Sequence, residues 1–280
     1  MEIKKLHNIT HESSTLYIAH RGESLFAPEN TMEAVNLAWQ KNADGIEIDV
    51  HLSRDNEIIV IHDKNTKRTT GLSHLIRNKN LEEIKKFHIK NTCNKSNLVI
   101  KIPTLNEVLD TVPKHKLVFI EIKCGIEILP MLKKVLKETR RDNSQIKIIC
   151  FNLNIISTVK KYLPQFEVLW IKRIGIEKSM LYLDGLSKII SKIKQNNIDG
   201  LNLSYSRFLS KNIVENVKSN KIKLFIWTVN DTQKALRLMS FGVDGIVSDK
   251  ASWLKNHLDE YSKLELGINN KRRNIYSNSF

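Results

Sequence analysis

The sequence is short of the residues that define several protein classes. Its 280 residues include only three cysteines, Cys93, Cys124 and Cys150, which are too widely spaced for a disulfide framework or a CxxC metal knuckle. No apolar run approaches the roughly 20 residues that cross a bilayer, and residues 1–14 lack the apolar stretch of a signal peptide. We therefore predict a cytoplasmic protein with reduced thiols and no transmembrane segment.

Acidic residues are also in deficit. The chain has 45 Lys and Arg against 30 Asp and Glu, a net charge of +15, which attracts nucleic acid, anionic lipid and phosphate esters alike. The lysines are scattered, with glutamates between them, and only Lys271–Arg273 forms a compact cluster. We interpret the charge as a solvated surface that can steer an anionic substrate. A non-catalytic nucleic-acid-binding protein has only this charge in its favour, because no nucleic-acid-binding motif is present.

Short β-branched runs alternate along the chain with segments of helical spacing. Alternating strands and helices predict an α/β protein with a parallel sheet, and eight units predict a closed (β/α)₈ TIM barrel, which typically takes ~250 residues. We assign one barrel domain to residues 1–255 and a polar, basic C-terminal tail to 256–280. The eight runs are Leu16–Ala19, Gly45–Val50, Leu117–Ile122, Ile146–Phe151, Val168–Ile171, Gly200–Leu203, Lys223–Val229 and Gly245–Val247.

One further apolar run, Ile58–Ile61, follows the second strand after a polar stretch too short for a crossover helix. It therefore predicts an antiparallel hairpin. A turn centred on Asp55 and Asn56 would place His62 opposite Asp49. The hairpin and the polar segment after it, residues 51–103 approximately, form a small capping insertion in this interpretation.

The dipeptide Asp-Gly precedes three of the predicted strands, at residues 44–45, 199–200 and 244–245. At these points a helix must turn back into the barrel. Glycine permits the positive φ that such turns often need, so we expect positive φ there.

Polar side chains gather at the predicted carboxyl ends of the strands, where parallel barrels place their active sites. A purely structural strand end would need few of them. They are His20, Arg21, Glu47, Asp49, Glu121, Lys123, Asn202, Ser204, Trp227, Asn230, Ser248 and Asp249, to which the hairpin adds His62.

Three carboxylates converge in this prediction. Glu47 and Asp49 lie two apart on one strand and so share a face, and Glu121 repeats the pattern on the next barrel strand. Converging carboxylates repel one another unless a positive charge neutralises them. All-oxygen ligands favour Mg²⁺ or Ca²⁺. Lys123 offers an alternative, a buried ion-pair network without metal.

His20 and His62 are the candidate acid and base. A lone histidine near a strand end is usually structural, but two beside a carboxylate cluster favour catalysis. Imidazole titrates near pH 6.5, so one ring can accept a proton while the other donates one. Arg21 is placed to hold a phosphate oxygen. With Lys123 these residues indicate an anion site.

The same residues stand in motifs that occur in one order along the chain. From about Leu16 to Trp253, these motifs resemble the signature of the glycerophosphodiester phosphodiesterases. The motifs are His20-Arg21-Gly22, Pro28-Glu29-Asn30-Thr31, Glu47-x-Asp49, His62-Asp63, Arg68-Thr69-Thr70-Gly71, Ile102-Pro103-Thr104-Leu105, Glu121-Ile122-Lys123, Trp227-Thr228-Val229-Asn230 and Gly242-Val243-Asp244-Gly245.

The resemblance implies a metal-dependent enzyme that hydrolyses glycerophosphodiesters to sn-glycerol 3-phosphate and an alcohol such as choline or ethanolamine. It implies that the neighbouring glycerol hydroxyl attacks the phosphorus and gives a cyclic phosphate, which water then opens. The implied site comprises the acid–base pair His20 and His62, the Mg²⁺ or Ca²⁺ ligands Glu47, Asp49 and Glu121, and the substrate-binding residues Arg21 and Lys123 for the phosphoryl oxygens and Trp227 for the glycerol.

A rival hypothesis keeps the barrel and changes the substrate. A lysophospholipase D or a phospholipase-like lyase would act on lysolipids and would need an apolar groove or a loop that contacts a lipid surface. The apolar residues of the insertion could serve such a groove or could equally be core. They are Leu72, Leu75, Ile76, Leu81, Ile84 and Phe87.

Overall fold

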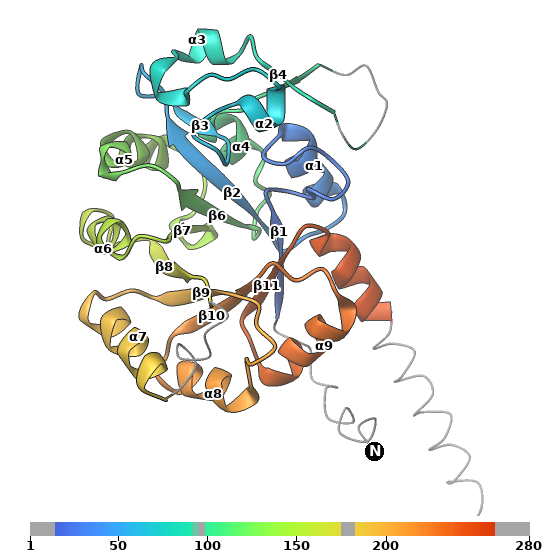
Figure 1. Ribbon diagram of the computed structural model, residues 1–280, viewed down its shortest axis with the longest axis vertical. Coiled ribbons are helices and arrows are strands. Elements are labelled where there is room, and N and C mark those ends of the chain that lie inside the picture. The colour runs from blue at the N-terminus through green and yellow to red at the C-terminus, as the bar shows by residue number, and fades with distance from the viewer. Residues whose placement is uncertain (1–14, 92, 94–98, 175–182, 261–280) are drawn as a thin grey trace, which may run out of the picture.

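The computed structural model describes residues 15–91, 93, 99–174 and 183–260 of the chain, and a closed barrel forms its centre (Figure 1). Each barrel strand pairs in parallel with the next along the chain, and the last pairs with the first. The predicted (β/α)₈ barrel is therefore confirmed. Its strands are β1 (Leu16–His20), β2 (Gly45–Leu52), β6 (Leu117–Ile122), β7 (Ile146–Cys150), β8 (Glu167–Lys172), β9 (Gly200–Ser204), β10 (Lys223–Trp227) and β11 (Gly245–Ser248).

Helices surround the strands, and short polar side chains begin most of them. Thr31, Asn152, Ser210 and Asp231 each accept a backbone N–H of the first turn of the helix that follows. The helices are α1 (Met32–Gln40), α4 (Leu105–Thr111), α5 (Leu129–Glu138), α6 (Leu153–Tyr162), α7 (Leu183–Gln195), α8 (Lys211–Ser219) and α9 (Thr232–Phe241), with 3₁₀ turns η3 (Ile126–Ile128) and η4 (Asn143–Gln145).

Residues 251–260 are also helical. This helix crosses the predicted boundary between the barrel and the tail, and that boundary stays a prediction. Residues 261–280, with the basic cluster, lie outside the described residues. Among the described helices, none has the length and apolar character needed to cross a membrane. The cytoplasmic location stays a prediction.

Apolar side chains form two layers around the strands. The larger layer lies between the strands and the helices, and the smaller one fills the barrel interior. The interior layer consists of Ile18, Phe119, Ile149, Leu169, Ile171, Phe225 and Val247. Because these side chains fill the interior, the polar side chains at the carboxyl ends of the strands face the open mouth of the barrel.

The prediction of positive φ at the three Asp-Gly pairs is wrong. Gly45, Gly200 and Gly245 do not have positive φ. A Cβ at any of them would lie 2.6 to 2.9 Å from a neighbouring strand's atoms, so these positions require glycine for lack of space. The aspartate before Gly45 forms hydrogen bonds to the two neighbouring strands. Asp44 accepts the N–H of Tyr17 in β1 with its carboxylate and the N–H of Leu117 in β6 with its carbonyl.

The insertion has an apolar core of its own. It contains β3 (Ile58–Val60), α2 (Lys67–Thr70), η2 (Ile76–Asn78), α3 (Leu81–Ile84), β4 (His88–Ile89) and β5 (Ile100–Lys101). Its core residues are Ile59, Ile61, Ile76, Ile84, Ile89, Ile100 and Ile102, with Leu81 and Phe87 packed against them. Most of the insertion's apolar residues are therefore core, whereas Leu72 is exposed.

The hairpin is confirmed, but its predicted register is wrong by one residue. Val50 pairs with Val60, and Ile61 donates its N–H to the carbonyl of Asp49, so His62 is not opposite Asp49. The cause is a three-residue turn, Arg54–Asn56, in which Asn56 has φ of 64°. A three-residue loop shifts the register by one relative to the two-residue turn that we expected.

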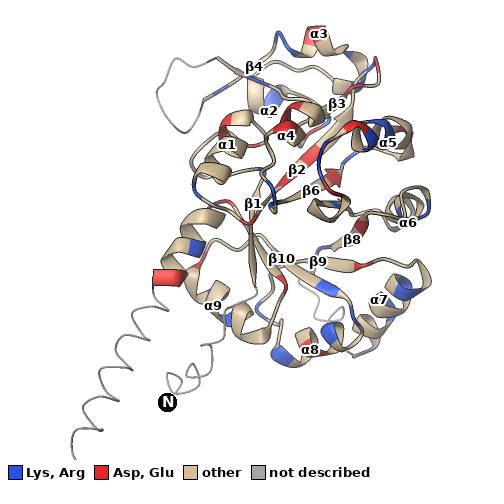
Figure 2. Cartoon of the chain, turned by 180° about the vertical axis from the view of Figure 1, so that it is seen from behind, with Lys and Arg blue, Asp and Glu red and all other residues tan. Residues whose placement is uncertain are grey.

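The charges are distributed unevenly. Figure 2 shows acidic segments on β2 and β6 in the barrel wall, whereas basic segments lie on outer helices such as α7 and α8. Acidic side chains are thus present within the barrel wall itself, where Glu47, Asp49 and Glu121 are buried, while α7 and α8 carry basic residues outside it (Figure 2).

Candidate active site

Three carboxylates meet at the carboxyl ends of β2 and β6. Glu47 and Asp49 are 2% and 1% exposed, and Glu121 is 8% exposed. One oxygen from each lies within 4.8 Å of the others. The alternation of side chains along β2 places Glu47 and Asp49 on the same side, and β6, paired beside it, adds Glu121.

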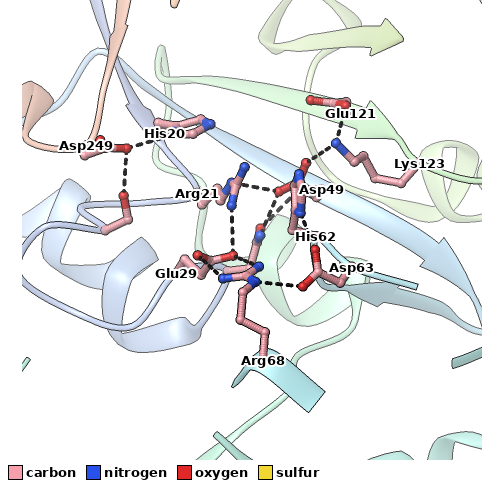
Figure 3. Close-up of polar contacts among 12 residues, drawn as sticks. His20, Arg21, Glu29, Asp49, His62, Asp63, Arg68, Glu121, Lys123 and Asp249 are labelled. Atoms are coloured by element: carbon pink, nitrogen blue, oxygen red, sulfur yellow. Dashed lines mark hydrogen bonds and ion pairs between the residues drawn. The ribbon is translucent and has the colours of Figure 1, made fainter. Parts of the chain in front are cut away.

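Two cations neutralise part of this charge (Figure 3). Arg21 Nε lies 3.2 Å from Asp49 Oδ2, and Lys123 Nζ lies 2.7 Å from Glu121 Oε1 and 3.4 Å from Asp49 Oδ1. Glu47 Oε1 and Asp49 Oδ1 are nevertheless buried without a hydrogen bond. Buried carboxylate oxygens without a donor are costly, so the cluster fits a further positive charge.

Burial and mutual repulsion shift the pKa values of the cluster. Burial, followed by Asp49 and Glu121, raises the pKa of Glu47 well above its ordinary value. Burial and Asp49 raise the pKa of Glu121 to about 7. Burial acts in the same direction on Asp49, but Arg21 and Lys123 outweigh it and lower the pKa of Asp49. Two of the three carboxyls therefore favour a proton or a cation near neutral pH.

His20 is held by an aspartate from the far end of the barrel sequence. Its Nδ1 lies 2.7 Å from Asp249 Oδ1, and Asp249 also accepts hydrogen bonds from Ser24 and Asn230. Burial opposes ionisation of Asp249, but the bonds from His20 and Asn230 lower its pKa. An ionised carboxylate accepts the Nδ1 proton, which leaves Nε2 available, 3.9 Å from Glu47 Oε2.

His62 is held by its neighbour in the chain. Its Nδ1 lies 2.7 Å from Asp63 Oδ1, and Asp63 Oδ2 accepts a 2.7 Å hydrogen bond from Arg68. Arg68 donates two more, each of 2.8 Å, to Glu29, which also accepts from Arg21. These four residues, Arg21, Glu29, Asp63 and Arg68, form a chain of ion pairs that we call the arginine bridge (Figure 3). The bridge connects the insertion to the loop after β1.

A left-handed turn after β1 directs Arg21 into the mouth. Arg21 has φ of 56°, and its N–H donates to Glu47 Oε2 at 3.1 Å. Gly22 follows with φ of 78°, and a Cβ there would lie 2.6 Å from the backbone of Ala34. Glycine is therefore required by both conformation and space.

The opposite half of the mouth is aromatic and apolar. Phe151 and Trp227 meet edge to face, with ring centroids 5.6 Å apart. The Arg173 guanidinium lies 5.6 Å from the Trp227 ring centroid. Trp227 Nε1 donates to the carbonyl of Asn202, whose own side-chain oxygen is buried without a hydrogen bond.

A cavity of about 110 Å³ separates the two halves. Of the eight predicted site residues, seven line it, and Asp49 lies beneath, in contact with Arg21 and Lys123. The structure thus brings the predicted set together, while the role of each residue stays a prediction. The seven are His20, Arg21, Glu47, His62, Glu121, Lys123 and Trp227.

Two further residues, Asn30 and His51, support the site and are not among the predicted site residues. Asn30 donates to the carboxylate of Asp49 and accepts the Asp49 N–H. His51 continues the alternation of Glu47 and Asp49, and its Nε2 lies 3.0 Å from the carbonyl of His62. The spacing of two residues was the signal that identifies His51. Asn30 stands in a quoted motif, but only the fold shows its contact.

Comparisons with known proteins relate the chain to one family. The model of the glycerophosphoryl diester phosphodiesterase family matches residues 20–252. A glycerophosphodiester phosphodiesterase of Caldanaerobacter subterraneus subsp. tengcongensis is 35% identical over 246 residues, which cover 86% of this chain and 97% of that protein. Lysophospholipase D GDPD1 of Homo sapiens is 25% identical over 275 residues, covering 88% of this chain and 87% of that one.

A solved structure gives the same result for the fold. An Oleispira antarctica phosphodiesterase in complex with the product sn-glycerol-3-phosphate superimposes with a TM-score of 0.76 and 26% identity. The alignment covers 86% of this chain and 96% of that chain.

Proposed function

This chain belongs to the glycerophosphoryl diester phosphodiesterase family, and we propose that its barrel mouth hydrolyses glycerophosphodiesters with His20 and His62 as the acid–base pair. The family makes the chain a phosphoric diester hydrolase. One observation carries the proposed mechanism: two imidazoles, each held through Nδ1 by an aspartate, line a single cavity with acidic and basic side chains.

The substrate would lie across the two halves of the mouth. Arg21 and Lys123 would hold the phosphoryl oxygens, since both cations face the cavity. Trp227 and Phe151 would contact the carbon atoms of the glycerol. The Oleispira antarctica phosphodiesterase that binds sn-glycerol-3-phosphate supports this glycerol phosphate end of the substrate.

The two imidazoles would move protons in opposite directions. In the first step the adjacent glycerol hydroxyl attacks phosphorus, one imidazole takes its proton, and the other protonates the departing alcohol oxygen as its P–O bond breaks. The product of this step is a cyclic phosphate. In the second step water gives its proton to the second imidazole, and the first protonates the ring oxygen that leaves. sn-Glycerol 3-phosphate results.

Glu47, Asp49 and Glu121 would hold Mg²⁺ or Ca²⁺. The two undonated oxygens and the raised pKa of Glu47 support this assignment. A divalent cation supplies positive charge for the oxygens that become more negative as phosphorus is attacked. Asn30 would fix the orientation of Asp49 through both of its amide atoms.

The test is release of glycerol 3-phosphate from glycerophosphocholine and glycerophosphoethanolamine, measured with a coupled dehydrogenase in Mg²⁺, Ca²⁺ or EDTA. We expect turnover that requires metal and that His20→Ala and His62→Ala reduce by at least about 10². His88→Ala is the matched control, since His88 is exposed on β4 of the insertion. Calorimetric titration of Mg²⁺ into wild type and Glu47→Gln reports metal binding apart from activity.

Two outcomes contradict the proposal. Turnover that survives both EDTA and the histidine variants would rule out the mechanism. Equal metal affinity of wild type and Glu47→Gln would rule out the assigned ligands.

Lysolipid hydrolysis is the second candidate. Leu25, Phe26, Ile126 and Phe151 are exposed apolar side chains on the segments that follow β1, β6 and β7, at the same end as the cavity. Such residues can contact a lipid surface. Release of choline from lysophosphatidylcholine at least as fast as from glycerophosphocholine would favour this candidate.

A further inference from the structure

A large groove opens on the insertion side of the mouth. Its volume is about 820 Å³, and it is lined by residues that include His51, His62, Asp63, Lys64, Lys67 and Lys123. A second cavity of about 440 Å³ shares His51, Lys64 and Lys123 with it. We call the larger of the two the lysine groove.

The lysine groove begins at the proposed reaction centre. His62 and Lys123 line both the groove and the small cavity between the halves of the mouth, whereas His20 lines only the small cavity. A phosphoryl group held by Arg21 and Lys123, with its glycerol against Trp227, would direct its other ester oxygen toward His62. The alcohol on that oxygen would then enter the groove.

The charge of the groove is positive. Lys64 and Lys67 are exposed, and neither makes an ion pair with any residue that the structure describes. The same holds for Arg77, which lines the adjoining cavity together with the carboxylate Glu127. The acidic residue of the groove, Asp63, is already occupied by His62 and Arg68. Positive charge is therefore in excess where the alcohol would lie.

Among the described residues, no Phe, Tyr or Trp lines the groove, and its only aromatic rings are the imidazoles of His51 and His62. Quaternary ammonium groups are usually held by the faces of Trp, Tyr or Phe rings. The groove offers a choline group no indole, phenol or phenyl face, and its carboxylate, Asp63, is already bound by His62 and Arg68. Lys64 and Lys67 would repel the choline cation. The same lysines attract a phosphate or a carboxylate.

We propose that the lysine groove binds the alcohol half of the substrate and selects alcohols that carry a phosphate or carboxylate of their own. This inference rests on the proposed glycerophosphodiester hydrolysis and adds the class of alcohol. It also assigns a different proton transfer to each histidine. His62 Nε2 protonates the oxygen of the departing alcohol, and His20 Nε2 accepts the proton of the glycerol hydroxyl.

The experiment compares three substrates that share the glycerol phosphate half. Glycerophosphocholine has a cationic alcohol, glycerophosphoglycerol a neutral one, and glycerophosphoinositol 4-phosphate an anionic one. We expect kcat/KM to rise in that order, with the anionic substrate roughly tenfold or more above the cationic one at low salt.

The decisive variant is Lys64→Glu/Lys67→Glu. We expect it to lower kcat/KM for glycerophosphoinositol 4-phosphate by roughly tenfold or more and to raise it for glycerophosphocholine. The matched control is Lys188→Glu/Lys192→Glu, because these exposed lysines make the same change in net charge on α7, which lies on the other side of the barrel (Figure 1). The control should leave the ratio between the substrates unchanged.

A binding measurement separates this inference from the proposed function. Inositol 4-phosphate and choline are titrated into wild type and into Lys64→Glu/Lys67→Glu. Binding of inositol 4-phosphate that the variant loses supports the groove, even if no glycerophosphodiester is hydrolysed and the proposed function fails. Turnover of all three substrates without regard to charge, or an equal response of both double variants, overturns the inference while the proposed function stands.

Discussion

His20 and His62 each present Nδ1 to an aspartate oxygen 2.7 Å away, yet different parts of the fold hold the two pairs. The partner of His20 is 229 residues away in the chain and comes from the end of β11. The partner of His62 is the next residue. The first pair is therefore set by closure of the barrel, and the second by the insertion and the arginine bridge.

The same histidine–aspartate geometry is thus held once by the barrel and once by the insertion. The barrel pair lies against strands whose interior residues are buried almost completely. The insertion pair depends on a small isoleucine core and on Arg68, whose side chain is 47% exposed. Because a small core stabilises less, the insertion pair is the one whose position can change without unfolding of the barrel.

The sharpest way to distinguish the pairs is a change of leaving group. A p-nitrophenyl ester of glycerol phosphate needs no acid, because nitrophenolate departs as a stable anion. With His20→Ala we expect the first-turnover rate to fall by about 10³ for both this ester and an alkyl ester such as glycerophosphoglycerol. With His62→Ala we expect the same loss for the alkyl ester but less than about tenfold for the nitrophenyl ester.

The His62→Ala reaction should also stop at an intermediate. His62 would be the base for the attacking water, so the cyclic phosphate should accumulate, visible by ³¹P NMR. Equal losses for both variants on both esters would show that the pairs do not differ in role.

Substitution of the two aspartates that contact the histidines tests the same difference in role between His20 and His62. Asp249→Asn and Asp63→Asn each replace an acceptor of the Nδ1 proton with an amide that can reverse the tautomer. We expect kcat on the alkyl ester to fall by about 10² in both. On the nitrophenyl ester, only Asp249→Asn should be slow. Near-identical activity of Asp249→Asn and wild type would argue against His20 as the base.

The barrel half should also respond to pH, because the carboxyl groups with raised pKa values, Glu47 and Glu121, lie on its strands. Below its folded pKa of about 7, Glu121 holds a proton that the unfolded chain releases from about pH 4.5 upward. The folded state then binds more protons, so the free energy of unfolding of the metal-free protein should fall by on the order of 2 kcal/mol from pH 4.5 to pH 7.

Urea unfolding in EDTA at these pH values measures this slope. Saturating Mg²⁺ should restore stability at pH 7. Glu121→Gln should flatten the slope, and an unchanged slope in this variant would assign the effect to other groups.

The smallest expected effect comes from breaking the arginine bridge. Arg68→Met removes the contacts to Asp63 and Glu29 while keeping much of the side-chain length. Because Arg68 is half exposed, we expect a loss of stability below about 1 kcal/mol. Activity on the alkyl ester should fall by roughly tenfold, since His62 loses its support.

Arg54→Met is the control for the bridge. Arg54 contacts Glu83 within the insertion and makes no contact with the barrel half in the described residues. A loss of activity in this control equal to that of Arg68→Met would mean that the insertion as a whole, and not the bridge, orients His62.

The barrel, and the positions of the candidate site residues on its strands, could be predicted from the sequence. Alternation identified Glu47 and Asp49 as neighbours on one face, and the strand ends placed His20 and Glu121 near them. The position of His62 could not be predicted in the same way. Its register depends on the length of a turn, and Asn56 permits a three-residue loop as readily as a two-residue one.

Contacts between distant segments were also beyond prediction. Asp249 lay at a strand end, but its bond to His20 depends on the closure of β11 onto β1. The sequence predicts turn conformations for the glycines that begin β2, β9 and β11, whereas atoms of neighbouring strands leave no room for a side chain there. Local patterns report which face a side chain occupies, and only the folded chain reports how much room it has there.

The bond between His20 and Asp249 has a consequence for synthesis on the ribosome. A nascent chain can complete the first seven strands of its barrel and still lack the aspartate that orients its proposed base. Under the proposed mechanism, activity would then appear only after β11 has been made and has paired with β1. Fragments that end before β11 would lack the pair of His20 and Asp249, and we expect them to hydrolyse no glycerophosphodiester.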